Sequence, residues 1–370
     1  MSNIQKNNKP NVPNLRFPEF SGEWKKSILK AECEINPKTG PLADTFQYID
    51  LESVVKGQLI KVNYLKKEDA PSRAQRVLSK WDILYQCVRP YQLNNFLVRD
   101  NSSTQRVAST GYAQIRTNNN PDFFFQLLHT QKFTGRVINR CTGTNYPAIN
   151  STDLSEIEIN IPEIKEQEKI GRMLSLIDQR IAIQNRLIEK YESLIKAIAF
   201  EIIGRNRSNT TLSDCVFCSS STLKESELIN TGIPTYGAAG ISGYTAEALC
   251  KSDSILITKD GSGVGSKRYV HGEHSFVGTL CSLTPKDGIY LPYVYYALMI
   301  MNLDTYKTGQ AIPHIYFKDY GKLQLFCPTY SEQRRLSHGL ETLDRKVGYE
   351  ESLLLSINEV KKGLLDQLFI

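Results

Sequence analysis

The sequence contains no long apolar stretch. The longest, Tyr293 to Met301, has nine residues, whereas a helix that crosses a membrane needs roughly 18 to 20. The first ten residues, MSNIQKNNKP, lack the apolar core of a signal peptide. We therefore expect a cytoplasmic protein without a membrane partner, in which the eight cysteines stay reduced.

Motifs for catalysis are incomplete where they occur. Asn120-Pro121-Asp122-Phe123 comes close to the NPP(F/Y) motif with which amino-methyltransferases hold the target nitrogen, but Asp122 replaces the second proline. No companion cofactor loop is found, and the acidic-x-Lys that follows Pro-Asp in a common nuclease core is missing. We interpret the segment as a turn that starts a helix.

A glycine-rich segment, Gly261-Ser-Gly-Val-Gly265, is neither a GxGxxG fingerprint nor a P-loop. The residues that follow, 267–270, are typical of a strand, so no helix N-terminus faces the loop. Three interpretations stay open: a flexible hairpin, a loop that approaches DNA phosphates beside Lys259, Lys267 and Arg268, or a nucleotide-binding loop.

Metal-ligand patterns are also incomplete. Cys215-Val-Phe-Cys218 is a single CxxC, whereas a zinc site usually takes two such pairs. His271-Gly-Glu-His274 is not an HExxH motif and has no obvious third ligand. The sequence therefore predicts no metal, no cofactor and no catalytic residue in this chain.

The composition is that of a globular protein with a modest positive charge. The 370 residues are 41% hydrophobic and 23% charged, which suits two or three domains with their own cores. Of the formal charge of +6, residues 1–162 carry 21 basic against 15 acidic side chains, and residues 205–329 carry 11 against 10. A polyanion would be attracted first to the first block.

An internal repeat dominates the sequence. Residues 142–204 align without a gap on 308–370, with 12 of 63 positions identical. A TG-x3-P-x-I motif begins at Thr142 and again at Thr308, and a P-x3-EQ motif begins at Pro162 and again at Pro328. This is duplication at the scale of a domain, since solenoid repeats are roughly 20 to 50 residues long.

Each copy ends in a predicted helix of about 40 residues, roughly 60 Å long. Apolar residues step by 4 and 3, the seam of a coiled coil. The first seam is Ile170, Leu174, Ile177, Ile181, Gln184, Ile188, Tyr191, Ile195, Ile198 and Ile202, and the second is Leu336, Leu340, Leu343, Val347, Glu350, Leu354, Ile357, Lys361, Leu364 and Leu368.

The two seams are the natural partners for each other, because one helix cannot bury its own stripe. Both become polar at the same step, Gln184 and Glu350. In an antiparallel pair these residues would lie near the middle, within about one turn of each other, and would fix the register. Two separate helices, each lying on its own domain, are the alternative.

The blocks between the helices show parallel features of mixed α/β character. Short strands are predicted at 82–85 and 254–258, later strands at 112–116 and 279–283, and proline-started helices at 121–128 and 292–299. We therefore predict an α+β fold: two similar mixed α/β domains alternating with two long helices that form an antiparallel coiled coil, with pseudo-twofold symmetry.

The two repeated motifs, the domain–helix–domain–helix order and the opening Leu15-Arg-Phe-Pro-Glu-Phe20 with Trp24 resemble the specificity subunit of a type I restriction-modification system. The resemblance covers nearly the whole chain. It implies target recognition domains at 1–162 and 205–328, and spacer helices at 163–204 and 329–370.

The resemblance also implies a function without catalysis. Each globular domain would read one half of a bipartite, asymmetric DNA site, and the helices would set the spacing and dock two methyltransferase subunits. S-adenosylmethionine, ATP and magnesium would belong to partner subunits, which include a translocase-nuclease. Two half-sites about one helical turn apart, roughly 34 Å, would suit such a protein.

Side chains that contact phosphates or bases are most often Arg, Lys, Asn, Gln or small polar groups. The candidates for DNA contact are Arg73, Arg76, Lys80, Arg89, Arg99, Arg106, Arg116, Arg136, Arg140 and Asn145 in the first block, and Tyr236, Lys259, Lys267, Arg268, His271, His274, Lys307, Gln310 and His314 in the second. The TG motifs themselves either approach DNA or only turn the chain into the spacer helix.

Two other functions stay possible from the sequence alone. An enzyme that modifies DNA in its own right, an adenine methyltransferase or a nuclease, would need a cofactor or metal motif that the sequence does not provide. A scaffold whose two domains bind proteins would need no basic surface. The near-neutral second block is compatible with such a scaffold.

Overall fold

The computed structural model describes residues 10–261, 263–309 and 312–370, which form two compact units. Unit 1 contains residues 10–183 and 354–370, and unit 2 contains residues 184–353. The two longest helices, α5 (Ile164–Ala199) and α9 (Tyr330–Leu368), contribute residues to both units. Within the ranges described, no helix has both the length and the apolar character needed to cross a membrane.

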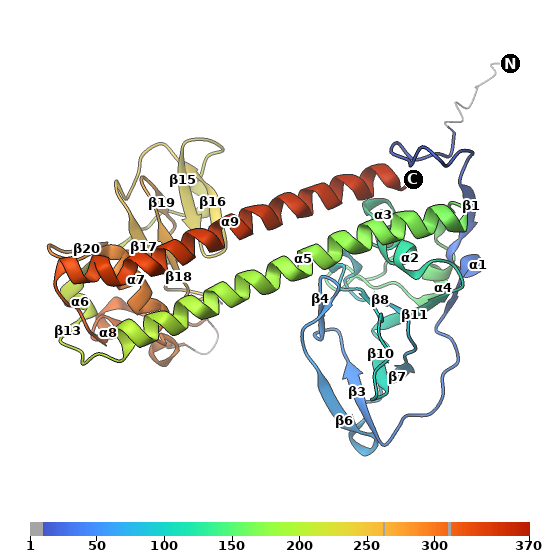
Figure 1. Ribbon diagram of the computed structural model, residues 1–370, viewed down its shortest axis with the longest axis horizontal. Coiled ribbons are helices and arrows are strands. Elements are labelled where there is room, and N and C mark those ends of the chain that lie inside the picture. Colours follow the sequence, from blue (N-terminus) through green and yellow to red (C-terminus); the bar gives the residue numbers. More distant parts are fainter. Residues whose placement is uncertain (1–9, 262, 310–311) are drawn as a thin grey trace. The chain divides into compact units, whose positions relative to one another are not determined.

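The globular part of unit 1 is built from short strands and helices that precede α5 (Figure 1). In chain order they are β1 (Lys25–Ile28), α1 (Leu29–Glu32), β2 (Cys33–Ile35), β3 (Thr45–Ile49), β4 (Val54–Val55), β5 (Gln58–Leu59), β6 (Asn63–Lys66), η1 (Lys67–Asp69), β7 (Ala74–Val77), β8 (Ile83–Gln86), η2 (Pro90–Gln92), β9 (Phe96–Leu97), β10 (Arg106–Ser109), β11 (Tyr112–Thr117), α2 (Pro121–Leu127), α3 (Gln131–Ile138), α4 (Ser151–Ser155) and β12 (Glu158–Ile161).

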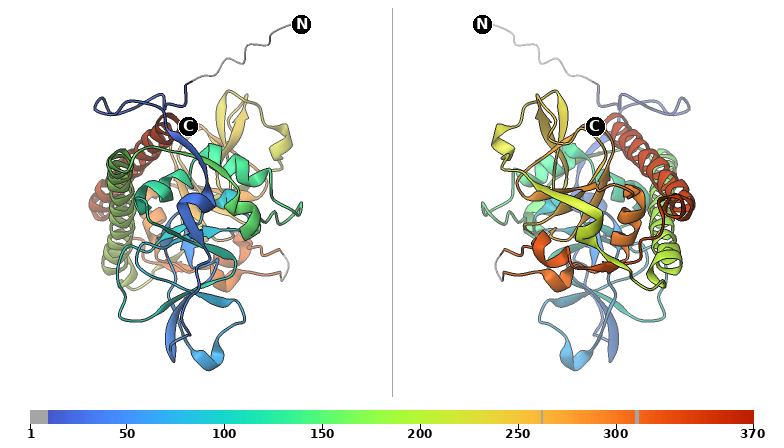
Figure 2. Two further views of the ribbon diagram at one scale, coloured as in Figure 1. Left: turned by 90° about the vertical axis from the view of Figure 1, so that its right-hand side faces the viewer. Right: turned by 90° about the vertical axis from the view of Figure 1, so that its left-hand side faces the viewer.

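Three sheets and a small hairpin organise unit 1. An antiparallel sheet has the order β2-β11-β8-β9, and a second has the order β6-β3-β10-β7, in which β3 and β10 run parallel. The strands β1 and β12 form an antiparallel pair, and β4 and β5 a hairpin. The sheet that contains β3 and β6 projects away from α5 (Figures 1 and 2).

The core of unit 1 is closed by the C-terminal turns of α9. The aromatic face of α2, with Phe123 and Phe124, packs in one buried cluster with Leu368 and Phe369. The rings of Phe123 and Phe369 lie 5.2 Å apart. Residues far apart in the sequence therefore share one core.

Unit 2 contains a second set of elements that ends in α9. The π turn η3 (Phe200–Gly204) extends α5, and it is followed by β13 (Thr210–Thr211), α6 (Leu212–Cys215), β14 (Val216–Ser220), η4 (Glu225–Glu227), β15 (Ile233–Gly237), β16 (Gly240–Thr245), β17 (Ser254–Thr258), β18 (Lys267–Val270), β19 (Ser275–Phe276), β20 (Leu280–Pro285), α7 (Leu291–Met299), η5 (Asp304–Tyr306), α8 (Phe317–Tyr320) and β21 (Gln324–Leu325).

The sheets of unit 2 repeat those of unit 1. The order β14-β20-β17-β18 matches β2-β11-β8-β9, with every pair antiparallel in both. The sheet β16-β15-β19 matches β6-β3-β10, including one parallel pair, and β13 with β21 matches β1 with β12. Unit 1 adds β7 and the β4–β5 hairpin. The predicted α+β fold with two similar domains is confirmed, and Figure 2 shows the β15–β16 hairpin standing out from the rest of unit 2.

The two long helices run antiparallel. In unit 1, Lys361 Nζ of α9 lies 2.5 Å from Asp178 Oδ1 of α5. In unit 2, Gln184 of α5 donates from Nε2 to Glu350 of α9, to the carboxylate and, at 3.1 Å, to the backbone carbonyl. As the residue number rises along α5 it falls along α9, which confirms the predicted direction and the predicted closeness of Gln184 and Glu350. The pseudo-twofold symmetry stays a prediction.

The glutamine of each P-x3-EQ motif joins a long helix to the globular part of its unit. Gln167 is buried, donates to Pro162 O at 2.9 Å and accepts from Asn120 N at 3.2 Å. Gln333 is buried in the same way and donates to Pro328 O at 2.8 Å. It accepts at 2.8 Å from the backbone N–H of the residue that precedes α7. In each unit the glutamine therefore accepts from the residue just before the proline-started helix. The repeated motif thus connects the long helix to that helix in the same way in both units.

Candidate nucleic-acid interface

The first TG motif forms a closed loop. The backbone N–H groups of Thr142 and Ala148 each donate to the other residue's carbonyl at 2.9 Å. Gly143 has φ +86°, and a Cβ there would lie 3.1 Å from Tyr146 O. Glycine is therefore required both by the backbone conformation and by the close approach of the loop to itself.

This loop is held against the segment that follows β8. Arg89 N donates to Pro147 O at 2.8 Å, and Ile149 N donates to Cys87 O at 3.0 Å. Arg89 has φ +53°, an uncommon conformation for a residue with a side chain. We define these two joined segments, residues 87–89 and 142–149, as loop pair 1.

Unit 2 contains the same arrangement, which we call loop pair 2 and define as residues 259–261, 308–309 and 312–315. Thr308 and His314 exchange backbone hydrogen bonds of 2.9 Å, and Gly309 has φ +87°. Gly261 N donates to Pro313 O at 3.0 Å. Ile315 N donates at 2.9 Å to the carbonyl of the residue that corresponds to Cys87. Gly261, with φ +93°, therefore corresponds to Arg89.

The alternative in which the TG motifs only turn the chain into the spacer helices is wrong. The helix α4 and the strand β12 lie between the first motif and α5, and α8 and β21 lie between the second motif and α9. Each loop closes on itself and on the end of a central strand. The motif is a fixed structural element of its domain.

Aromatic and cationic side chains surround loop pair 1. The guanidinium of Arg89 lies 4.2 Å from the ring centre of Tyr146, a cation–π distance. The Nε atoms of Arg76 and Arg89 are buried and have no hydrogen-bond partner within the described part of the chain. Burial lowers the pKa of Arg76 from its ordinary value. Asn145, the residue before Tyr146, is exposed.

Cations also surround loop pair 2, but several are partnered. Lys259 Nζ lies 3.0 Å from Asp260, and Lys307 pairs with an aspartate at 2.6 Å. Lys267 donates to a backbone carbonyl at 2.7 Å, and burial, with Lys196 nearby, lowers its pKa to about 8.

The remaining predicted candidates are paired with carboxylates, bonded to backbone carbonyls, exposed to solvent or placed near an aromatic ring. Arg99, Arg106 and Arg116 pair with Asp122, Asp100 and Asp82, and His271 with Asp253. Arg136 and Arg140 donate to backbone carbonyls. Arg73 and Lys80 are exposed, whereas Arg268 lies 5.7 Å from the ring centre of Tyr236.

One candidate is buried, and another lies outside the described residues. His274 is fully buried, with Ser254 Oγ and Gly272 O each 2.8 Å from its ring nitrogens. Its inclusion among the DNA contacts is therefore wrong, because no surface of it is left to meet DNA. Gln310 lies outside the described residues. For the other candidates, DNA contact stays a prediction.

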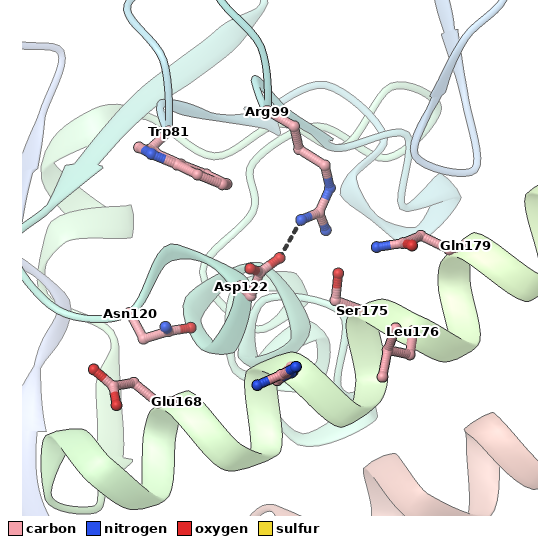
Figure 3. A pocket seen from close by; sticks show the side chains of 9 residues that line it. Trp81, Arg99, Asn120, Asp122, Glu168, Ser175, Leu176 and Gln179 are labelled. Atoms are coloured by element: carbon pink, nitrogen blue, oxygen red, sulfur yellow. Dashed lines mark hydrogen bonds and ion pairs between the residues drawn. The ribbon is translucent and has the colours of Figure 1, made fainter.

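The Asn-Pro-Asp segment lines a hollow of about 590 Å³ against α5, which also includes Trp81, Arg99 and Gln179. Figure 3 shows Asp122 facing Arg99 across this hollow. The side chain of Asn120 accepts from Phe123 N at 2.9 Å and so caps α2. Both polar side chains of the motif are used structurally, which agrees with its interpretation as a helix start. Among the residues described, no three or more His, Cys, Asp or Glu side chains gather to hold a metal ion.

Tyr146 and Ile312 are not among the candidates predicted from the sequence. Both occupy the same place in the repeated motif, 166 residues apart, and both are exposed. The signal was present in the alignment of the two copies, where the flanking Gly and Pro are identical and this position is not.

Comparison with known proteins agrees with the duplicated fold. The family described as type I restriction modification DNA specificity domain matches residues 51–193 and again residues 210–359. The chain therefore belongs to this family and contains two of its domains.

Individual relatives are more distant. A putative type I specificity subunit of Mycoplasma genitalium, S.MgeORF438P, is 28% identical over 251 residues, 61% of this chain and 65% of the relative. The HindI specificity subunit of Haemophilus influenzae is 26% identical over 156 residues, 41% of this chain and 34% of the relative. The matched part thus spans less than two thirds of either relative.

A crystal structure of a type I restriction-modification S subunit from M. genitalium has the same fold. Its TM-score is 0.62 at 20% sequence identity, and the alignment covers 97% of this chain and 99% of that chain. At this identity the likeness concerns the fold.

Proposed function

We propose that this chain recognises DNA sequence as the non-catalytic specificity subunit of a type I restriction-modification complex. Each unit reads one half of a bipartite, asymmetric site. The paired helices set the distance between the half-sites and dock the methyltransferase subunits. S-adenosylmethionine, ATP and magnesium belong to the methyltransferase and translocase-nuclease partners.

The observation that carries this proposal is the repetition of one framework with different side chains. The sheets and loop pairs of the two units have the same connections, yet Arg89 corresponds to Gly261 and Tyr146 to Ile312. Two similar frameworks with different surfaces suit two different half-sites. The membership of both domains in a DNA specificity family supports the same conclusion.

Selection from a random duplex pool by the purified full chain tests this function. The selected duplexes should share two short conserved blocks separated by a constant gap. Affinity should fall steeply with salt, with a slope of about −0.9 for each phosphate contacted. Binding without sequence preference, or without dependence on salt, would contradict the proposal and would favour a protein scaffold.

The same preparation tests the absence of catalysis. Alone, the chain should neither transfer methyl groups from S-adenosylmethionine to DNA nor cut it. Either activity, removed by changing Asp122 to Ala, would restore the enzyme hypothesis for the Asn-Pro-Asp segment.

A further inference from the structure

We propose, on the basis of the DNA-reading function above, that Tyr146 and Ile312 are the residues at which each unit determines its base preference. Each would contact bases of one half-site. Tyr146 would act in the half-site read by unit 1, and Ile312 in the half-site read by unit 2.

The two residues occupy the same backbone position of the same loop. In each loop a Thr and the residue six positions later exchange a pair of backbone hydrogen bonds of 2.9 Å, and the glycine that follows the Thr has nearly the same φ, +86° or +87°. Tyr146 and Ile312 each lie three residues after that glycine and directly before a proline whose carbonyl is hydrogen-bonded to the strand-end segment. The two residues therefore occupy equivalent backbone positions.

Both side chains are large, apolar and open to solvent, with exposed fractions of 65% for Tyr146 and 68% for Ile312. A single exposed apolar residue is ordinary on a protein surface. Here a large apolar side chain is exposed at the same position of both copies, although the copies share few residues. Such a coincidence indicates a functional surface more strongly than one exposed residue does. This repeated exposure is consistent with contact between each side chain and a binding partner.

The loop framework is the same in both units while the tip differs. The Thr, Gly and Pro of the motif are identical, whereas the tip carries tyrosine in one unit and isoleucine in the other. Contacts to phosphates position a protein on DNA, and contacts to bases distinguish sequences. A constant loop backbone with a variable apolar side chain is the arrangement expected for contacts to bases.

One basic side chain belongs to each loop pair. The guanidinium of Arg89 lies 4.2 Å from the ring centre of Tyr146, whose side chain remains 65% exposed. Lys259 belongs to loop pair 2, which carries Ile312, and pairs with Asp260 of the same loop pair at 3.0 Å. An aliphatic tip such as Ile312 suits the methyl group of thymine, and the phenol of Tyr146 can both pack against a base and form a hydrogen bond.

Exchange of the two side chains tests this assignment. The variants Tyr146→Ile and Ile312→Tyr, made in the full chain, are compared with the unaltered protein by selection from a random duplex pool. Tyr146→Ile should change the preference at one base position of one half-site by roughly tenfold and leave the other half-site unchanged. Ile312→Tyr should do the same in the other half-site only.

Matched controls are available on the long helices. Tyr349 and Ile183 have exposed fractions of 72% and 53% and lie on α9 and α5. Tyr349→Ile and Ile183→Tyr should leave both half-sites unchanged. Tyr146→Phe keeps the ring, so it separates the contribution of the hydroxyl and serves as a second variant if Tyr146→Ile does not fold.

Each other outcome overturns the assignment. Unaltered preference in both exchange variants would show that the tips do not contact bases. Equal weakening for all sequences would show a contact that positions DNA without reading it. If the unaltered chain selects two half-sites, failure of the exchange concerns Tyr146 and Ile312 alone; if it selects none, the proposed function fails as well.

Discussion

The glutamates of the two P-x3-EQ motifs have the same place in the repeat and different roles. In unit 1, Glu166 is fully buried and accepts from Arg16 at 2.7 and 2.8 Å and from Trp24 at 3.4 Å. In unit 2, Glu332 is exposed and accepts from Thr329 at 3.1 Å, as a residue near a helix start often does. The adjacent glutamine forms the same joint in both units. Identity of a residue in a repeat therefore does not establish identity of its role.

Removal of the charge at Glu166 should cause the largest loss of stability among the variants considered. Glu166→Gln leaves Arg16, whose side chain is 16% exposed, without its ion pair, which should lower the free energy of unfolding of unit 1 by about 3 kcal/mol. Urea unfolding followed by tryptophan fluorescence reports on unit 1, because both tryptophans, Trp24 and Trp81, belong to it.

The matched variant is Glu332→Gln, followed by far-UV circular dichroism. Because Glu332 is exposed, its loss should cost less than about 1 kcal/mol. Equal losses in the two variants would contradict the different roles assigned to the two glutamates.

Mild acid should weaken unit 1 through His129. Burial, with Lys361 nearby, lowers the pKa of His129 to about 4. Between about pH 6.5 and pH 4 the unfolded chain therefore binds a proton that the folded chain does not, so stability falls as pH falls. From pH 6.5 to pH 5 the loss should be about 2 kcal/mol, measured as a shift of the urea midpoint. His129→Gln should remove this part of the pH dependence, and an unchanged slope would exclude His129 as its source.

The buried histidine of unit 2 should respond in the opposite direction. Burial acts to lower the pKa of His274, but hydrogen bonds to Cys250 and Gly272 outweigh it and raise the pKa above its ordinary value. Its contribution to stability is therefore complete below about pH 6.5 and is lost as pH rises through the folded-state pKa. The acid response thus distinguishes the two units.

Replacement of glycines in the long helices by alanine should change the free energy of unfolding least. The change should have opposite signs at Gly171 and Gly339. A Cβ at Gly171 of α5 would lie 2.6 Å from Asn120 Oδ1 and 2.7 Å from Phe123 N, so Gly171→Ala should cost about 1 to 2 kcal/mol by forcing α5 and α2 apart. A Cβ at Gly339 of α9 would meet no described atom within 4 Å, and Gly339→Ala should stabilise the protein by up to about 1 kcal/mol. Urea unfolding measures both, and stabilisation by Gly171→Ala would show that the contact relaxes freely.

The periodic parts of the fold could be predicted from the sequence. The 4-and-3 spacing predicted both long helices, and the shared polar step predicted that Gln184 and Glu350 lie together, as their hydrogen bond confirms. The proline-started helices at 121–128 and 292–299 were also predicted close to their observed limits. These features depend on local periodicity and local turn chemistry, which the residues themselves carry.

Residue order is sufficient to establish the duplication and the two long helices, because repeats and heptads are patterns along the chain. Their antiparallel direction is established by the contacts of Asp178 with Lys361 and of Gln184 with Glu350. Which cations are already paired could be learned only from the folded structure, because ion pairs such as Arg116 with Asp82 join residues 34 positions apart. The folded structure also decided that a histidine would be buried, and that the tips of the TG loops would present Tyr146 and Ile312. Burial and ion pairing depend on contacts between segments that are distant in the sequence. Local sequence patterns do not specify those contacts.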